Sequence, residues 1–324
     1  MRIVWIVAAA LAALAPNPAA AQGWRHGPSG VGIAALPEGL SLGRVNERLD
    51  GGDVYVQVGT DEEPVTIYVY RSAYPNVALW FERTRLAMNV NVGSGDRAAE
   101  PRSFTLGASP SPNGLREEIA LPAGGRFRST AVAIAQYGEW IVKVRITSAG
   151  LDEAGVRARM DRLLAAIELP GSVPAPHPLR VPGLCAEDGN FTGQALSSSD
   201  LNAGTGAALR LAAAEARGRG GLAANPDGWC RARAAMPSQL GTLYHRRDGS
   251  GWTALISDAG IGISAYRIEL PDADGAATFA VNPGMTGLVQ IFDRLPAPET
   301  ALEAAVQVLI GRSPPQSRIE ADSR

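Results

Sequence analysis

A proline-rich segment near the middle of the chain constrains the fold more than any other feature. Pro170 to Pro182 contains five prolines in thirteen residues. Proline fixes φ and has no backbone N–H, so this stretch can continue neither a helix nor a central strand. We therefore expect an extended linker over residues 170–183. It would join a domain over residues 22–169 to a second domain over residues 184–312, followed by a disordered tail over residues 313–324.

The first 21 residues have the layout of a secretory signal peptide. Arg2 supplies a positive charge, residues 3–15 form an apolar run, and the small residues Ala19 to Ala21 precede Gln22. This run is shorter than the roughly 20 apolar residues that span a bilayer. We expect the peptide to be removed near Ala21, leaving a periplasmic or secreted chain without a transmembrane segment.

The first half predicts an antiparallel sheet covered by helices. Residues 53–59 and 65–71 alternate apolar and polar side chains around a turn, which is typical of a hairpin. Apolar residues at helical spacing predict an amphipathic helix over residues 152–167. The other elements expected in this half are a helix over residues 76–89 and strands over residues 103–107, 115–121, 127–136 and 140–147. This is an α+β pattern.

This order of elements resembles a known family. A hairpin, a helix, antiparallel strands and a closing amphipathic helix, the last part reading WIVKVRITSAGLDEAGVRARMDRLLAAIEL, is similar to the PsbP-like fold and related bacterial envelope domains over about residues 27–170. The resemblance implies a non-enzymatic binding or assembly factor. It transfers no functional residue, because no catalytic motif accompanies it.

The second half predicts a further α+β domain with an antiparallel meander. Asp248-Gly249 marks a hairpin turn between two apolar strands. The expected elements are a helix over residues 207–217, strands over residues 240–246, 252–257, 262–269, 277–281 and 288–293, and a final amphipathic helix over residues 299–310. The fold class is therefore α+β, with antiparallel sheets covered by amphipathic helices in two domains.

The only two cysteines, Cys185 and Cys230, both follow the proline-rich segment. An even number of cysteines in an exported chain favours a disulfide. A redox enzyme would normally show a CxxC pair, which is absent here. We therefore predict a structural Cys185–Cys230 bridge.

Histidine is scarce, and only one histidine lies on a regular element. His245 ends a predicted strand near Ser250 and Asp258, so a serine hydrolase triad of these three residues is one hypothesis. No nucleophile elbow GxSxG supports it. His26, near the expected new N-terminus, and His177, in the linker, are not expected to be held in a rigid site.

A binding surface is predicted on the helix over residues 76–89. Trp80 and Phe81 could form an exposed aromatic patch, with Arg83 and Arg85 supplying charge, and these residue types are enriched in binding hot spots. The alternative is that both aromatic side chains anchor the helix on the sheet while the arginines face water.

Charge and motifs exclude several functions. The formal net charge of −2 gives no basic face for nucleic acid. Lys143 is the only lysine, is expected to reach solvent, and does not belong to a phosphate-binding loop. We expect no metal and no cofactor, since no ligand spacing is typical of either. The leading hypothesis is an exported, non-catalytic binding or assembly module whose partner is an unknown envelope protein or small ligand. The alternative is the hydrolase.

Overall fold

The computed structural model describes residues 23–47, 53–71, 76–92, 101–171, 179–196, 228–233, 241–256, 260–270, 273–282 and 285–309. Four of the predictions above lie outside these residues: the signal peptide over residues 1–21, the helix over residues 207–217, the tail over residues 313–324, and Asp258. Most of the proline-rich segment, residues 172–178, lies outside them as well.

The first half forms a seven-stranded antiparallel sheet, as its alternating pattern predicts. The predicted hairpin is β4 paired with β5 over its whole length, and apolar side chains of both strands point to one face. The strands, in spatial order, are β3 (Leu42–Glu47), β4 (Asp53–Gly59), β5 (Pro64–Arg71), β9 (Trp140–Ser148), β8 (Ser129–Tyr137), β7 (Gly114–Ala120) and β6 (Arg102–Phe104). A small sheet of β1 (Trp24–Arg25), β2 (Gly32–Ile33) and β10 (Ile167–Glu168) accompanies it.

Two helices cover opposite faces of this first sheet. Helix α2 (Glu153–Ala166) packs on one face, and α1 (Val77–Val92) packs on the other. Strand β8 shows the division, because Ala133 belongs to the hydrophobic cluster under α2 and its neighbour Ile134 to the cluster under α1. Successive strand residues point to opposite faces, so β8, whose central residues 131–135 are all apolar, is buried on both sides.

Lys143 does not reach solvent, contrary to expectation. It is 1% exposed on the α1 face of β9, directly opposite Tyr68 in the β5–β9 ladder. Its ammonium lies 4.3 Å from the centroid of the Tyr68 ring, which is a cation–π distance. The reason is that the α1 face of the first sheet is covered both by α1 and by residues of the second half of the chain.

The second half forms a six-stranded antiparallel meander. Its strands are β11 (Trp229–Arg231), β12 (Thr242–Arg246), β13 (Gly251–Leu255), β14 (Gly262–Leu270), β15 (Ala273–Asn282) and β16 (Met285–Phe292), and α4 (Pro298–Leu309) packs on one face. The predicted strands and final helix are all present. Strand β11 was not predicted, because three residues are too few for a periodic pattern.

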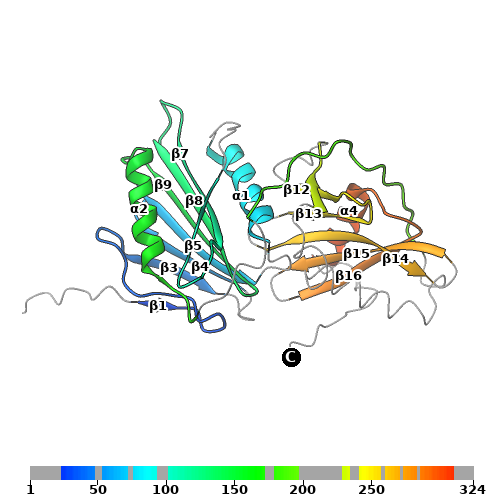
Figure 1. Cartoon of the computed structure of the whole chain (residues 1–324), viewed down its shortest axis with the longest axis horizontal. Coiled ribbons are helices and arrows are strands. Elements are labelled where there is room, and N and C mark those ends of the chain that lie inside the picture. Colours follow the sequence, from blue (N-terminus) through cyan, green and yellow to red (C-terminus); the bar gives the residue numbers. More distant parts are fainter. Residues whose placement is uncertain are drawn as a thin grey trace, which may run out of the picture.

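Helix α1 lies between the two sheets. One hydrophobic cluster contains Trp80 and Phe81 of α1, Ile134 of the first sheet, and Tyr244 and Phe279 of the second. The layers therefore follow in the order α2, first sheet, α1, second sheet, α4. Figure 1 shows α1 between the first sheet and the strands of the second half. The described core is continuous across both halves of the chain.

The segment that follows the proline-rich stretch crosses the second sheet from one edge to the other. At one edge Cys185 and Gly183 exchange backbone hydrogen bonds with Arg231 of β11. At the other edge Leu196 bonds to Ile291 of β16. We call residues 183–196 the strap. Among the described residues, no helix is both long and apolar enough to cross a membrane.

Candidate functional site

A disulfide joins the strap to β11, the first strand of the second sheet. Backbone pairing of the strap with β11 places Cys185 beside Cys230, and their sulfurs are bonded. The predicted bridge is confirmed. Cross-linking residues 45 positions apart stabilises the fold by roughly 4 kcal/mol in the chain-entropy model. Both cysteines are buried, so the bridge is part of the local core.

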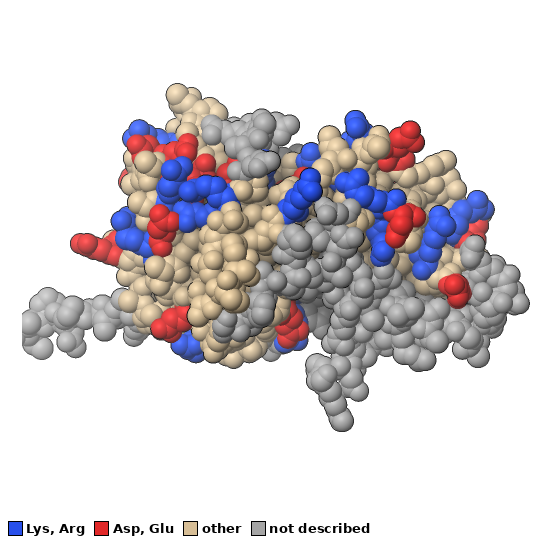
Figure 2. Space-filling model, in the orientation of Figure 1, with Lys and Arg blue, Asp and Glu red and all other residues tan. Residues whose placement is uncertain are grey.

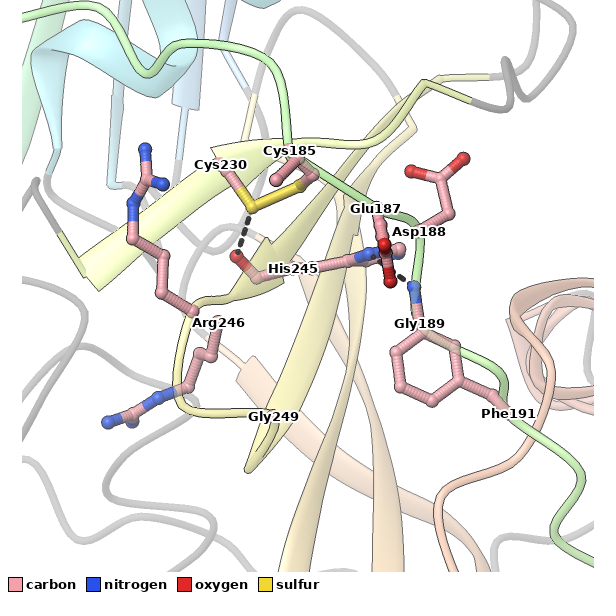
Figure 3. Close-up of a pocket in the computed structure, with 11 residues that line it drawn as sticks. Cys185, Glu187, Asp188, Gly189, Phe191, Cys230, His245, Arg246 and Gly249 are labelled. Carbon is pink, nitrogen blue, oxygen red and sulfur yellow. Dashed lines mark hydrogen bonds between the residues drawn. A yellow bond between two sulfur atoms is a disulfide. The ribbon is translucent and has the colours of Figure 1, made fainter.

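His245 lies directly across the β11–β12 ladder from Cys230 and is 5% exposed. Figure 3 shows its ring extending from β12 toward the turn at Glu187 to Gly189. The Gly189 N–H donates to Nδ1 at 3.3 Å, and Phe191 meets the ring edge-on with centroids 5.0 Å apart. A neutral ring that accepts at Nδ1 carries its proton on Nε2. Among the described residues, Nε2 has no hydrogen-bond partner although it is buried.

The charge state of His245 follows from its burial. Desolvation lowers the pKa of its imidazole below the ordinary value of 6.5, and the nearby Asp188 carboxylate only partly opposes this. The ring is therefore neutral at pH 7. Its Nε2–H is a hydrogen-bond donor that no described protein group uses, and a buried donor left unsatisfied costs about 1–3 kcal/mol.

An open pocket of about 340 Å³ surrounds this ring. Its wall includes the disulfide, Asp188, Phe191 and His245, as drawn in Figure 3. Arg233 fixes the strap side of the wall by two hydrogen bonds, from Nε to the Cys185 carbonyl at 2.6 Å and from its backbone N–H to Asp188 Oδ1 at 2.7 Å. Cys230 Sγ lies 3.6 Å from the His245 carbonyl oxygen, but a disulfide sulfur has no proton to donate.

The structure does not bring Ser250 to His245 as a nucleophile. The Ser250 hydroxyl donates to Asp248 Oδ1 at 2.6 Å, and the Ser250 backbone N–H donates to the same oxygen at 2.9 Å. Both bonds close the turn between β12 and β13. Burial raises the pKa of Asp248, but these bonds and Arg246 outweigh it and lower the pKa below 3.8. Asp258, the third member of the predicted triad, lies outside the described residues.

The predicted aromatic binding surface on α1 is wrong. Trp80 and Phe81 are both completely buried, and Trp80 packs edge-on against Tyr70 with centroids 5.8 Å apart. Arg83 is also buried and donates to the Ile256 carbonyl of the second sheet at 3.2 Å. Arg85 pairs with Glu117 of β7 at 3.1 Å. The signal that could have shown this is the unbroken apolar run from Val77 to Phe81, since a helix that is apolar on all sides is a buried one.

His26 is held rigidly, contrary to expectation. It is completely buried, its Nδ1 lies 2.8 Å from the Ser29 hydroxyl, and its ring meets Trp140 edge-on at 5.1 Å. The Val31 N–H donates to the Ser29 hydroxyl at 3.1 Å and so closes the turn. Desolvation lowers the pKa of His26, which Glu47 opposes and Arg71 reinforces. His177 lies outside the described residues.

A second pocket, of about 400 Å³, lies between α2 and the β6–β7 edge, lined by Phe104, Arg116, Asp161 and Leu164 among others. Beside it the buried carboxylate of Glu118 pairs with Arg102, with Arg116 at 2.6 Å and with Arg157 at 3.7 Å. Arg116 also pairs with Asp161 at 2.5 Å. Figure 2 shows basic and acidic side chains interleaved over this part of the surface. Glu153, which pairs with Arg157 at 3.0 Å, makes three carboxylates against these three arginines, so the named groups offer no excess charge to a ligand.

Comparisons with known proteins give no family and two distant structural likenesses. No protein-family model matches the chain, and no curated protein matches its sequence. Two solved structures share part of its architecture. A Bacteroides thetaiotaomicron protein solved at 1.50 Å is 12% identical over 47% of this chain and 49% of its own, with a TM-score of 0.29. The cyanobacterial PsbP (CyanoP) of Synechocystis is 14% identical over 49% of this chain and 98% of its own, with a TM-score of 0.32.

These likenesses bear out the weak PsbP-like architectural resemblance of the sequence. The match spans about half of the Bacteroides protein. At TM-scores of 0.29 and 0.32 neither match carries an argument beyond that weak resemblance. The function must be argued from the site.

Proposed function

We propose that the protein is an exported, non-catalytic binding or assembly module of the cell envelope, and that it holds a small ligand in the pocket beside the disulfide. The observation that carries this proposal is the buried Nε2–H of His245, which has no partner among the described residues. A ligand acceptor in the pocket would satisfy that donor. The pocket volume of about 340 Å³ lies at the lower end of the range for small-molecule sites.

The disulfide supports the exported location. Disulfides persist in oxidising compartments such as the periplasm and are rare in the cytosol. The Cys185–Cys230 bridge therefore fits an extracytoplasmic protein. The N-terminus of protein purified from the cell envelope is expected at Gln22, as measured by mass spectrometry. Recovery of the chain with Met1 intact would contradict export.

Native mass spectrometry tests the ligand. The full chain, purified in its oxidised form and treated with a chelator, is expected to retain one small organic molecule per chain. His245→Phe keeps a ring in the site but removes the Nε2 donor, so this variant is expected to lose the adduct. Arg126→Ala, which changes an exposed residue of the first half, serves as the control and is expected to keep it. An adduct that persists in His245→Phe, or no adduct in any form, would refute the pocket as the binding site.

One observation favours the alternative, an exported serine hydrolase, at a place other than His245. Ser29 contacts His26 at 2.8 Å, and Glu47 Oε1 lies 3.7 Å from the other ring nitrogen. A serine, a neutral histidine and a carboxylate are the parts of a hydrolytic triad. However, His26 is completely buried, Ser29 is 7% exposed, and 3.7 Å is too long for a hydrogen bond.

A fluorophosphonate probe separates the two functions, because it labels activated serines. We expect no labelling of the native chain, since the Ser29 hydroxyl is committed to its own turn. Labelling that disappears in Ser29→Ala and survives in Ser250→Ala would establish the hydrolase at the His26 cluster. The reverse pattern would support the predicted His245, Ser250 and Asp258 array.

A further inference from the structure

Four residues that line the pocket beside the disulfide carry the donor atoms that zinc prefers. Cys185, Asp188, Cys230 and His245 all contribute to its wall. The Cys185 sulfur, a carboxylate oxygen of Asp188 and a ring nitrogen of His245 lie within 4.8 Å of one another. The Cys230 sulfur is bonded to that of Cys185 and so lies beside the same group. Sulfur, nitrogen and oxygen donors thus converge on one volume that is open to solvent.

The spacing is close to that of a tetrahedral site. Zinc binds sulfur at about 2.3 Å and nitrogen or oxygen at about 2.0–2.2 Å, so its ligand atoms lie roughly 3.3–3.8 Å apart. The three donor atoms are therefore within about 1–1.5 Å of coordinating separations. The backbone of the strap is already held by Arg233 and by its pairing with β11, so it does not need to move. Rotation of the side chains supplies a change of that size.

The disulfide determines whether these donors can bind a metal. A disulfide sulfur carries no charge, and the thiolate is the form that coordinates zinc. We propose that the pocket is a redox-gated zinc site, which forms when the Cys185–Cys230 bond is reduced and is absent when it is oxidised. This inference does not depend on the proposed function, which concerns the oxidised pocket.

The reaction balances with a dithiol as the reductant. The dithiol gives two electrons and two protons to the Cys185–Cys230 bond and becomes a disulfide itself. The two cysteine thiols then lose their protons to solvent as one Zn²⁺ binds both sulfurs. Asp188 and His245 complete four ligands without any further redox change.

His245 is suited to this role because its Nε2 has no hydrogen-bond partner among the described residues. Coordination at Nε2 requires the ring proton on Nδ1, so the 3.3 Å bond from Gly189 to Nδ1 is given up. That bond is long and therefore weak. The backbone N–H of Arg233, which donates to Asp188 Oδ1, remains as the outer-shell contact that orients the carboxylate.

Zinc titration of the full chain tests the proposal. The chain is reduced with a phosphine, which is then removed, and zinc binding is measured by calorimetry and by metal analysis after gel filtration. The reduced chain is expected to hold one zinc ion, and the oxidised chain none. Cobalt(II) in place of zinc is expected to show thiolate charge-transfer absorption only in the reduced chain. Equal binding by both forms, or no stoichiometric binding by the reduced form, would overturn the proposal, whether or not the reduced chain keeps its fold.

Variants identify the ligands. His245→Ala and Asp188→Ala are expected to weaken zinc binding by the reduced chain by roughly 100-fold. Glu187→Ala is the matched control, because this exposed carboxylate is adjacent to Asp188 but lies outside the converging group. It is expected to bind as the native chain does. Circular dichroism of the oxidised variants checks that each still folds. If Glu187→Ala bound zinc as weakly as His245→Ala, or if His245→Ala bound zinc with native affinity, the assigned ligands would be refuted.

Discussion

The two helices on either side of the first sheet differ in what lies beyond them. Helix α2 buries Val156, Met160 and Leu163 against the sheet and turns Arg157 toward water, where it pairs with Glu153. Helix α1 has a sheet on each side, and its described side chains are buried or half-buried around the whole helix. Arg157 and Arg162 on the exposed side of α2 are therefore solvated, whereas Arg83 of α1 is part of the packing.

Polar residues of α1 bond to groups of the second half of the chain. Arg83 donates to a carbonyl of the second sheet, and Glu82 faces Arg231 of β11 at 3.3 Å. In return, the Tyr244 hydroxyl of β12 donates to the Leu79 carbonyl at 3.3 Å. Helix α1 thus joins the two sheets by directional bonds as well as by apolar contact. Aromatic and arginine residues on a helix indicate a partner, and here the partner is the other half of the same chain.

The largest expected effect comes from Trp80→Ala. Removing a fully buried tryptophan costs about 3–5 kcal/mol of unfolding free energy. Because Trp80 belongs to the cluster shared by both sheets, hydrogen exchange is expected to show lost amide protection in the first and second sheets together. A loss confined to the first sheet would show that α1 does not couple the two halves.

Leu163→Ala is the corresponding change on α2. We expect a cost of about 2–5 kcal/mol, since Leu163 is 1% exposed. Its contacts lie within the cluster of the first sheet alone. Increased exchange is therefore expected in α2 and the first sheet, with the second sheet unchanged. Equal loss in the second sheet would mean that the two helices do not differ as described.

Asp152→Ala removes the N-cap of α2 and has a smaller expected effect. The Asp152 carboxylate accepts the Gly155 N–H at 2.8 Å. Loss of such a cap costs about 1 kcal/mol, measurable by urea unfolding. Arg162→Ala, an exposed change on the same helix, is the control and is expected to stay within about 0.5 kcal/mol of the native chain. An equal loss of unfolding free energy in Asp152→Ala and Arg162→Ala would show that the cap does not stabilise α2.

Glu82→Gln should change the pH dependence of stability more than stability itself. Burial raises the pKa of Glu82 above its ordinary 4.5, although Arg231 and Tyr244 oppose this. The folded chain therefore keeps this proton to a higher pH than the unfolded chain does. Its unfolding free energy falls as the pH rises from about 4.5 through the raised pKa, and then levels off. Glu82→Gln is expected to lack that fall in urea titrations at several pH values. An unchanged profile would show that Glu82 is not desolvated between the sheets.

The sequence predicts the β4–β5 hairpin and both amphipathic helices because each of these elements has one buried face. Strand β4 alternates residue by residue, and α2 follows its predicted stripe from Val156 to Leu164. Strand β3 escapes prediction because its side chains are half-buried or exposed and show no alternation. The position of α1 between two sheets could not be predicted, because hydrophobic periodicity shows that a face is buried but not how many sheets cover it.

The pocket could be predicted only in part. The cysteine count predicts the bridge, and position on a strand singles out His245. The strap residues Asp188 and Phe191 are separated from His245 by more than 50 positions, and no motif links them. Their convergence depends on the strap pairing with β11, which no local pattern encodes.

The strap also determines how the second sheet can meet other chains. An unpaired sheet edge presents rows of N–H and C=O groups that recruit further strands. Here one stretch of fourteen residues covers part of β11 at one edge and part of β16 at the other, and the disulfide fastens it at the β11 edge. The backbone groups that it covers are closed to strand addition, whether by a partner or by another copy of the chain. Opening the Cys185–Cys230 bond would remove the covalent link, and the strap would then be held at the β11 edge by backbone pairing and by Arg233 alone among the described contacts.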